Sequence, residues 1–304
     1  MYFTSLPDHT IPGFDEQSHF AKFKKHNIIF NATSKNAHCD SHVGCLSLKT
    51  VLRGEEWYGI NNRQLVIRPG QFLILNDDQT YSCRINQGES VRTFSIFFKK
   101  EFASSVFCNA LTNEETLLNN PFRDGDTPEF FQTLRSVDST LLLQLKNLVA
   151  SLEREGYNSF TVDEYLIFLL NYLVTVHQSD SSLSKKVNAV KSSTKIELYK
   201  RLCIAKDFLH SYYHDKVDLN AISAAACLSV PQLVRQFKSV FHTTPHQYLM
   251  KVRLQRAAEL LKNEIPVNEI AWCCGFENVS AFCRAFKSKY GVQPRGYSNY
   301  RYVN

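Results

Sequence analysis

Between residues 28 and 98, short apolar runs alternate with turn signals. Segments such as "QLVIRPGQFLIL" and "RTFSIFF" are separated by glycine, Pro-Gly or Asn-Asp. The turn signals recur roughly every 8 to 12 residues, which is typical of an antiparallel sandwich or barrel. The pattern predicts a small all-β barrel over about residues 28–110.

Beyond residue 139, the apolar period changes to that of an α-helix. Residues 140–155 and 162–177 each place apolar side chains at i, i+3, i+4 and i+7, with a glycine and an asparagine between the two segments. We expect an antiparallel helix pair packed on the barrel. The second helix is apolar nearly all round, more than one buried face requires. We therefore expect a homodimer interface on the helices at 140–177.

A polar segment separates these helices from the rest of the chain. Residues 178–194, "QSDSSLSKKVNAVKSST", are serine-rich and lack periodicity, which favours a flexible linker. The chain has 304 residues, which is long for one ordinary core. We expect one domain at 1–177 and a second at 195–304.

The second domain contains a repeat. "SVPQLVRQFKSVFHTTPHQY" begins at Ser229, and "ENVSAFCRAFKSKYGVQPRGYS" begins at Glu277. An offset of 49 residues aligns their R-x-F-K segments, the aromatic residues that follow, and their P-x-x-Y segments. Upstream the offset is 48, so one residue has been gained at a turn. This pattern predicts two copies of a helix-turn-helix unit.

Each copy contains a helix with a buried aromatic stripe and an exposed cationic face. Asp218 and Ser229 are expected to cap the two helices of the first copy, and Asn278 the second helix of the second copy. Gly275 is expected to form the turn of the second copy. Residues 245–264 have the composition of a long connecting helix. Two helices held on such a rod can enter successive major grooves of B-DNA, about 34 Å apart.

The charge distribution is consistent with this interpretation. From residue 191 onward the chain carries 17 Lys and Arg against 8 Asp and Glu, whereas the first 190 residues carry 18 against 21. An excess of positive charge in one domain is typical of nucleic-acid binding. A solvated basic face is the alternative that charge alone leaves open.

The stretch "VNEIAWCCGFENVSAFCRAFKSKYGVQPRGY" resembles the signature of the AraC/XylS family of bacterial transcription regulators. The resemblance covers residues 195–300, about a third of the chain. It implies an α+β protein with an N-terminal cupin-like β-barrel and helical pair, followed by an all-α double helix-turn-helix domain. It also implies sequence-specific binding of double-stranded DNA and contact with RNA polymerase, more often as an activator.

The same resemblance implies the residues that contact DNA. In the first copy they are Pro231, Gln232, Val234, Arg235 and Lys238. In the second copy they are Asn278, Ser280, Ala281, Cys283, Arg284 and Lys287. The two arginines fit guanine edges, but phosphate clamps and internal salt bridges are alternatives. The lysines favour phosphate contact or the helix dipole. The first copy lacks the usual turn glycine, and its proline and valine favour contact with thymine methyl groups.

In this family the barrel often binds a small effector or controls dimerisation. The candidate effector residues are His38, His42, Trp57, Tyr58 and Tyr81. The spacing H-x-x-x-H differs from the H-x-H that places two metal ligands on one face of a strand, so we expect no metal or other cofactor. Ordinary surface or turn roles for the histidines, and barrel filling by the aromatic residues, are the alternatives.

No catalytic residues are predicted, because the chain lacks a G-x-S-x-G, a P-loop or a convincing metal triad. A regulator is favoured over two alternatives, a cupin-class enzyme fused to a DNA-binding domain and an interaction adaptor that binds no DNA. The nine cysteines include no C-x-x-C pair, which favours reduced thiols. The longest apolar stretch, 165–176, falls short of the ~20 residues of a membrane span. We expect a cytoplasmic protein without membrane contact.

Overall fold

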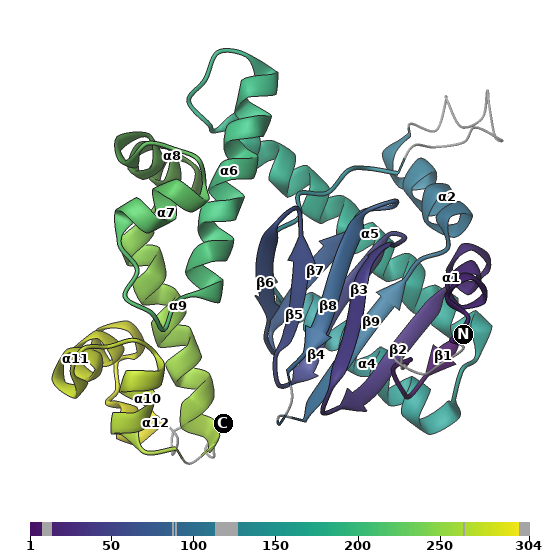
Figure 1. The fold of residues 1–304 in the computed structure, drawn as a ribbon, viewed down its shortest axis with the longest axis horizontal. Helices are drawn as coiled ribbons and strands as arrows, with labels where there is room; N and C mark the ends of the chain where they lie inside the picture. Colours follow the sequence, from purple (N-terminus) through teal and green to yellow (C-terminus); the bar gives the residue numbers. More distant parts are fainter. Residues whose placement is uncertain (8–13, 87, 89, 113–126, 264, 298–304) are drawn as a thin grey trace. The chain divides into compact units, whose positions relative to one another are not determined.

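The computed structural model describes residues 1–7, 14–86, 88, 90–112, 127–263 and 265–297. Residues 298–304 of the expected C-terminal domain lie outside this part. The chain forms two compact units, residues 1–182 and 183–304 (Figure 1). The division falls inside the segment that was expected to be a linker.

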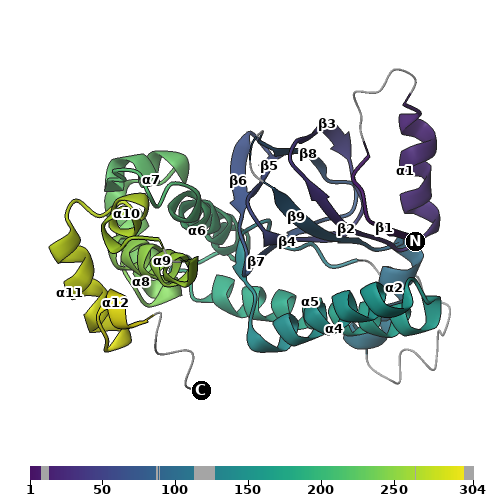
Figure 2. The same ribbon diagram turned by 90° about the horizontal axis from the view of Figure 1, so that it is seen from below.

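The N-terminal unit is built on two β-sheets. One has the strand order β1-β2-β9-β4-β7-β10 and the other β3-β8-β5-β6. Figure 2 shows them as two layers that face each other. The strands are β1 (Tyr2–Phe3), β2 (Ile28–Ser34), β3 (Ala37–Val43), β4 (Ser47–Arg53), β5 (Glu56–Ile60), β6 (Arg63–Ile67), β7 (Gln71–Leu75), β8 (Thr80–Ile85), β9 (Val91–Phe97) and β10 (Arg135–Ser136).

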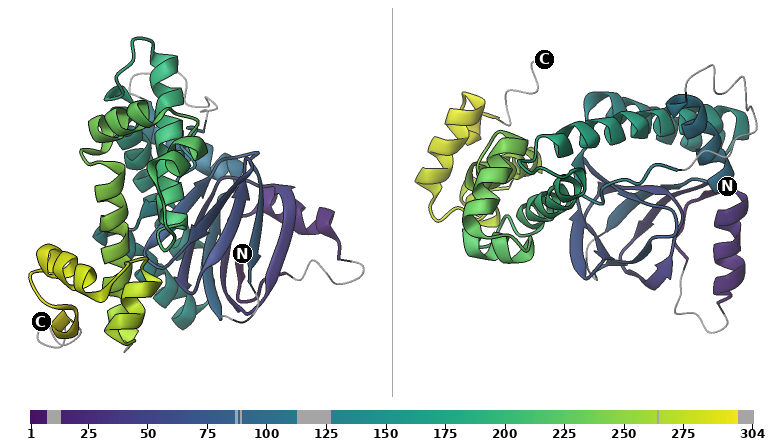
Figure 3. Two further views of the ribbon diagram at one scale, coloured as in Figure 1. Left: turned by 60° about the vertical axis from the view of Figure 1, so that its left-hand side comes forward. Right: turned by 90° about the horizontal axis from the view of Figure 1, so that it is seen from above.

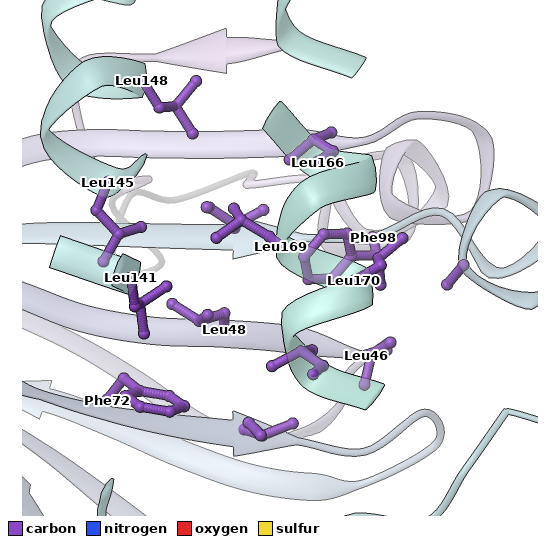
Figure 4. Packing of buried hydrophobic residues seen from close by; sticks show 14 of the residues in the cluster. Leu46, Leu48, Phe72, Phe98, Leu141, Leu145, Leu148, Leu166, Leu169 and Leu170 are labelled. Carbon is purple, nitrogen blue, oxygen red and sulfur yellow. The ribbon is translucent and has the colours of Figure 1, made fainter. Parts of the chain in front are cut away.

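Two helices cover the outer face of the six-stranded sheet. They are α4 (Ser139–Glu155) and α5 (Ser159–Lys185), close to the bounds predicted from periodicity (Figure 2). Their leucines point toward the sheet, as Figure 4 shows. The labelled core residues are Leu46, Leu48, Phe72, Phe98, Leu141, Leu145, Leu148, Leu166, Leu169 and Leu170. The predicted helix pair is confirmed.

The length and composition of α5 alone would suffice for a membrane span. Its inward side chains, including Leu166, Leu169 and Leu173, are fully buried in the core of the N-terminal unit. A core helix of a globular protein shows the same composition, because its apolar face packs on a sheet. Packing therefore accounts for much of its apolar character.

The predicted all-β segment at 28–110 needs a correction. Its strands end at Phe97, and Lys100–Leu111 forms the helix α2. Ala103 and Phe107, four residues apart, are buried in the same core as α4 and α5. This i, i+4 pair signals one helical face, and burial of that face favours a helix over another strand. A further helix, α1 (Glu16–Lys25), precedes the first long strand.

The expected flexible linker at 178–194 also needs a correction. Residues 178–185 continue α5, and the next helix begins at Ser192. Asp180 is only 2% exposed and forms an ion pair with Arg135 of β10. This buried contact fixes a segment whose serine-rich sequence otherwise indicates disorder.

The C-terminal unit is entirely helical in the part that the structure describes. The long helix α9 joins two helix-turn-helix units (Figures 1 and 3). It ends at Leu260, earlier than predicted, and continues as one turn of 3-10 helix. The elements are α6 (Ser192–Ser211), α7 (Leu219–Ala225), α8 (Val230–Phe241), α9 (Pro245–Leu260), η1 (Leu261–Asn263), α10 (Val267–Cys273), α11 (Val279–Tyr290) and α12 (Pro294–Tyr297).

Gly275 has a left-handed backbone, with φ of +74°, in the turn between α10 and α11. A Cβ atom there would lie 2.7 Å from the carbonyl oxygen of His214 and 2.9 Å from that of Tyr213. Gly291 has a similar φ of +78°, but a Cβ there would meet nothing within 4 Å. The two glycines therefore share a backbone conformation but differ in the space available for a Cβ atom.

We expect Gly275→Ala to destabilise the C-terminal unit more than Gly291→Ala does. Both variants lose about 1–2 kcal/mol to the left-handed conformation, and the Gly275 variant loses about 1–3 kcal/mol more to the steric clash. The chain has two tryptophans. Urea unfolding followed by Trp272 fluorescence in a Trp57→Phe background measures the difference. Equal losses would show that the close approach of the backbone has no energetic effect.

Candidate nucleic-acid interface and barrel cavity

The helices α8 and α11 bury the aromatic stripe that the repeat predicts. Leu233 and Phe237 of α8, and Phe282 and Phe286 of α11, have no exposed surface. The i+4 spacing puts each pair on one face of its helix. The opposite face of each helix is therefore available to solvent or to a partner.

The aromatic residues of the two copies pack in matching geometry. The rings of Phe237 and Tyr248 lie 5.6 Å apart and edge to face, and those of Phe286 and Tyr297 lie 5.2 Å apart in the same arrangement. Each phenylalanine also contacts the aromatic residue four positions later, at 4.7 and 4.6 Å, in the pairs Phe237–Phe241 and Phe286–Tyr290. The repeated P-x-x-Y segment thus supplies a tyrosine that holds the recognition helix in place.

Three predicted helix caps are confirmed. The carboxylate of Asp218 accepts a hydrogen bond from Ala221 N at 2.7 Å, and the hydroxyl of Ser229 accepts one from Gln232 N at 3.4 Å. The side-chain oxygen of Asn278 accepts a hydrogen bond from the third residue after it at 2.7 Å. Each cap satisfies an amide that the helix itself leaves free.

The turn of the first copy forms without glycine. Cys227 lies at the position that corresponds to Gly275 and adopts a left-handed backbone with φ of +51°. Its carbonyl oxygen accepts a hydrogen bond from Arg201 at 2.8 Å. The two helix-turn-helix units therefore share a backbone conformation at this turn despite the different residue.

Four basic side chains occupy the outward faces of α8 and α11. Arg235, Lys238, Arg284 and Lys287 are all exposed. Within the residues that the structure describes, their side chains form no hydrogen bond or ion pair. By contrast, Arg253 of α9 donates hydrogen bonds to backbone oxygens at 2.7 and 2.8 Å. The salt-bridge alternative for Arg235 and Arg284 thus finds no partner among the described residues, whereas groove and phosphate contact both remain open.

The other predicted contact residues lie around these cations. Pro231, Asn278 and Ser280 are exposed, whereas Gln232, Val234, Ala281 and Cys283 are half-buried. Cys283 packs partly against the core of the second copy. These positions bring short polar and apolar side chains to the same helix faces as the arginines.

The N-terminal unit encloses a cavity of about 620 Å³. Four of the five candidate effector residues line it, namely His38, His42, Tyr58 and Tyr81. Trp57 does not line the cavity, because successive residues of β5 point to opposite faces and the neighbouring Tyr58 takes the inner one. The guanidinium of Arg84 instead lies over the indole of Trp57, with its Cζ atom 5.2 Å from the ring centroid.

The two histidines contribute differently to the cavity. His38 is exposed and lies 2.8 Å from a carboxylate oxygen of Asp40. His42 packs between the rings of Phe20 and Tyr81, with centroids 4.7 and 4.4 Å away. His42 therefore forms part of an aromatic wall, whereas His38 lies near the surface.

Two ionisable groups of the cavity, Lys49 and Glu56, are not among the effector residues predicted from the sequence. Lys49 is 2% exposed, and its ammonium donates a hydrogen bond to the Tyr81 hydroxyl at 3.4 Å and lies 3.2 Å from the Phe97 ring centroid. Burial lowers the pKa of Lys49 to about 8. Glu56 is 5% exposed and accepts a hydrogen bond from Thr93 at 2.8 Å. Burial raises the pKa of Glu56 above its usual value.

The signal that could have revealed Lys49 is weak. It lies in "SLKTV", where all five residues are buried. The sheet has helices on one face and the cavity on the other, so the usual alternation of apolar and polar residues disappears. A lysine inside an apolar run is the remaining hint.

Comparison with known proteins identifies relatives of this chain. The family described as helix-turn-helix domain matches residues 222–300. The probable transcriptional regulator LumQ of Photobacterium leiognathi is 28% identical over 53% of this chain and 72% of its own length. The HTH-type transcriptional activator RhaS of Escherichia coli O139:H28 is 30% identical over 57% of this chain, which spans 58% of RhaS.

Among solved structures, the DNA-binding domain of AdpA, determined in complex with a target DNA, is similar to part of this chain. The two are 27% identical over 33% of this chain and 90% of the AdpA chain, with a TM-score of 0.32.

The buried Lys49 predicts a specific pH dependence of stability. The unfolded lysine keeps its proton up to about pH 10.4, whereas the folded one releases it near pH 8. Stability contributed by this residue therefore rises with pH across this window, by on the order of 3 kcal/mol in total. At pH 7 the charged, buried ammonium is a cost.

We expect Lys49→Met to be more stable than the wild type at pH 7 and to lose this advantage by pH 10. The difference between the two proteins isolates Lys49, because cysteines and tyrosines of raised pKa titrate in both. Urea unfolding followed by Trp57 fluorescence in a Trp272→Phe background measures it. A difference that stays constant from pH 7 to 10 would contradict a depressed pKa.

Proposed function

Because the chain belongs to the AraC/XylS family, we propose that it is a sequence-specific transcription regulator that binds double-stranded DNA through α8 and α11. The observation that carries this proposal is the pair of matching helices with unpaired cations on their outward faces. Arg235 and Arg284 occupy corresponding positions of the repeat, as do Lys238 and Lys287. A protein that used these helices only for packing would have no need of the same cations twice.

The chemistry of these faces suits the major groove. Arginine fits the O6 and N7 acceptors of guanine in a bidentate manner, and lysine neutralises phosphate as a compact charge. The helix N-termini, where Pro231 and Ser280 lie, are the parts that reach base edges in helix-turn-helix proteins. Val234 and Ala281 offer apolar contact to thymine methyl groups. We assign base reading to the arginines and their small neighbours, and phosphate contact to the lysines.

The N-terminal unit is proposed to control this activity. A small effector or a partner that binds it would alter how a dimer occupies two half-sites together. The proposed dimer interface lies on α4 and α5. Their exposed apolar side chains are Leu142, Leu143, Phe160 and Ile167.

We further propose that the regulator acts as an activator in the cytoplasm and contacts RNA polymerase. The relative RhaS is described as an activator, which supports this direction of regulation. The relatives are transcriptional regulators, not enzymes.

Selection of bound fragments from random duplex DNA by the full-length protein would test the proposed function. We expect an enriched motif with two boxes about one helical turn apart. Arg284→Ala should then lose about 1–3 kcal/mol at one base pair, with relaxed preference there. Lys287→Ala should weaken binding to all sequences alike. It should also make the slope of the logarithm of the binding constant against the logarithm of salt concentration less steep by roughly one.

Lys262→Ala is the matched control, since it removes one exposed positive charge of η1, outside both recognition helices. Binding is measured by fluorescence anisotropy at one fixed salt concentration. A uniform loss for Arg284→Ala would reassign that residue to phosphate. Enrichment of no motif by the wild type would refute sequence-specific binding.

The proposed dimer interface has its own test. We expect Leu143→Glu combined with Phe160→Glu to convert a dimer into a monomer, because two carboxylates would be buried in an apolar interface. Leu111→Glu changes a similarly exposed leucine of α2 in the same unit and should leave the dimer intact. Sedimentation velocity distinguishes the species. A dimer that survives the double change would exclude this face.

A further inference from the structure

Lys49 and Glu56 approach the same cavity from different sheets. Lys49 lies on β4 of the six-stranded sheet, and Glu56 lies on β5 of the four-stranded sheet. Both line the cavity, and both are at least 95% buried. Their opposite charges attract each other, but no hydrogen bond or direct ion pair joins the two side chains.

The ammonium of Lys49 has hydrogen-bonding capacity to spare. It has three N–H donors, of which one is used in a long hydrogen bond to Tyr81. The face of the Phe97 ring stabilises the charge but offers no acceptor oxygen. Among the residues that the structure describes, no carboxylate forms an ion pair with Lys49. Buried lysines are rare unless they are paired, so this position calls for an acceptor from outside the chain.

Glu56 has the complementary capacity. The hydroxyl of Thr93 donates a hydrogen bond to its carboxylate, and Tyr58 lines the same cavity two residues further along β5. An ionised carboxylate has about four acceptor positions. Glu56 therefore retains acceptor positions for further hydrogen-bond donors inside the cavity.

Part of the rest of the wall is aromatic, whereas other charged residues of the lining, such as Lys24, Arg84 and Lys100, are exposed. The phenylalanines that line the cavity are Phe20, Phe23, Phe30 and Phe97. Phe23 and Phe97 contact each other edge to face, with ring centroids 4.6 Å apart. A cavity of about 620 Å³ falls within the roughly 300–1,000 Å³ typical of small-molecule sites, which combine apolar walls with a few placed polar groups.

We propose that this cavity binds a small zwitterion of the amino-acid type, with its carboxylate on Lys49, its ammonium on Glu56 and its apolar side chain against the phenylalanines. Such a ligand compensates both buried charges at once. A plain organic anion would leave Glu56 without a direct charged partner, and a plain amine would leave Lys49 without one, each at the cost of a buried charge that no ion pair satisfies. The inference deepens the proposed function, since it names the effector class of the N-terminal unit.

The test uses one amino acid at a time with its two truncated analogues. Isothermal titration of the full-length protein at pH 7 measures binding of phenylalanine, tyrosine, tryptophan, leucine and methionine. For the amino acid that binds most tightly, binding of two analogues is then measured: the amine that lacks its carboxylate and the acid that lacks its amino group. For phenylalanine these analogues are phenethylamine and 3-phenylpropionate. We expect the amino acid to bind about tenfold to a hundredfold tighter than either analogue, because each loses one charged hydrogen bond.

Two variants assign the charges to residues. In Lys49→Met the amino acid and its amine should bind equally, since the partner of the carboxylate is gone. In Glu56→Gln the amino acid should lose its advantage over the acid. Lys22→Met removes an exposed lysine of α1 that does not line the cavity and should preserve both preferences. Thermal unfolding of each apo variant checks that it is folded.

Three results would overturn the inference: no binding of any of the five amino acids, equal binding of the acid analogue by the wild type, or unchanged preferences in both variants. DNA binding of the same proteins is measured in parallel. Lys49→Met leaves α8 and α11 intact. If the predicted amino-acid binding fails while sequence-specific DNA binding is preserved, only the proposed ligand class is refuted. If the wild-type protein shows no sequence-specific DNA binding, the proposed function is refuted instead.

Discussion

Edge-to-face packing of one phenylalanine on one tyrosine sets the geometry of each DNA-reading helix. Phe237 on Tyr248 and Phe286 on Tyr297 join the middle of the recognition helix to the helix that follows. The tyrosine comes three residues after a proline that begins that following helix, so its position is fixed by a short, rigid segment. The outward arginine of each copy, two residues before the phenylalanine, inherits its direction from this contact.

This arrangement separates stability from recognition along one helix. The inward stripe is apolar and fully buried, so the outward positions are free to carry charge without cost to the core. The side chains of Ser229 and Asn278 bond backbone amides at the helix N-termini. They therefore do not occupy the outward arginines. A helix built this way presents the same face whatever side chains occupy it, and sequence preference can change without loss of the fold.

The N-terminal unit follows a different constraint. Its six-stranded sheet is covered by α4 and α5 on one face, while its other face looks toward the second sheet (Figure 2). Strand residues are therefore buried on both faces, and four of the buried polar ones, Lys49, Glu56, Thr93 and Ser95, line the cavity. Lys49 and Glu56 remain charged or readily charged there only at a cost in desolvation. Charged groups retained at such a cost are characteristic of binding sites.

The two helix-turn-helix copies, their caps and the buried stripe around Phe237 and Phe286 follow from the sequence alone, because they depend on spacing within a dozen residues. The sequence also located the helix pair at 140–177 by period. It could not predict that residues 178–185 continue α5, because the buried ion pair of Asp180 joins residues 45 positions apart. Nor could it predict that Lys49 and Glu56 share a cavity, because strand pairing and the packing of two sheets decide which side chains meet.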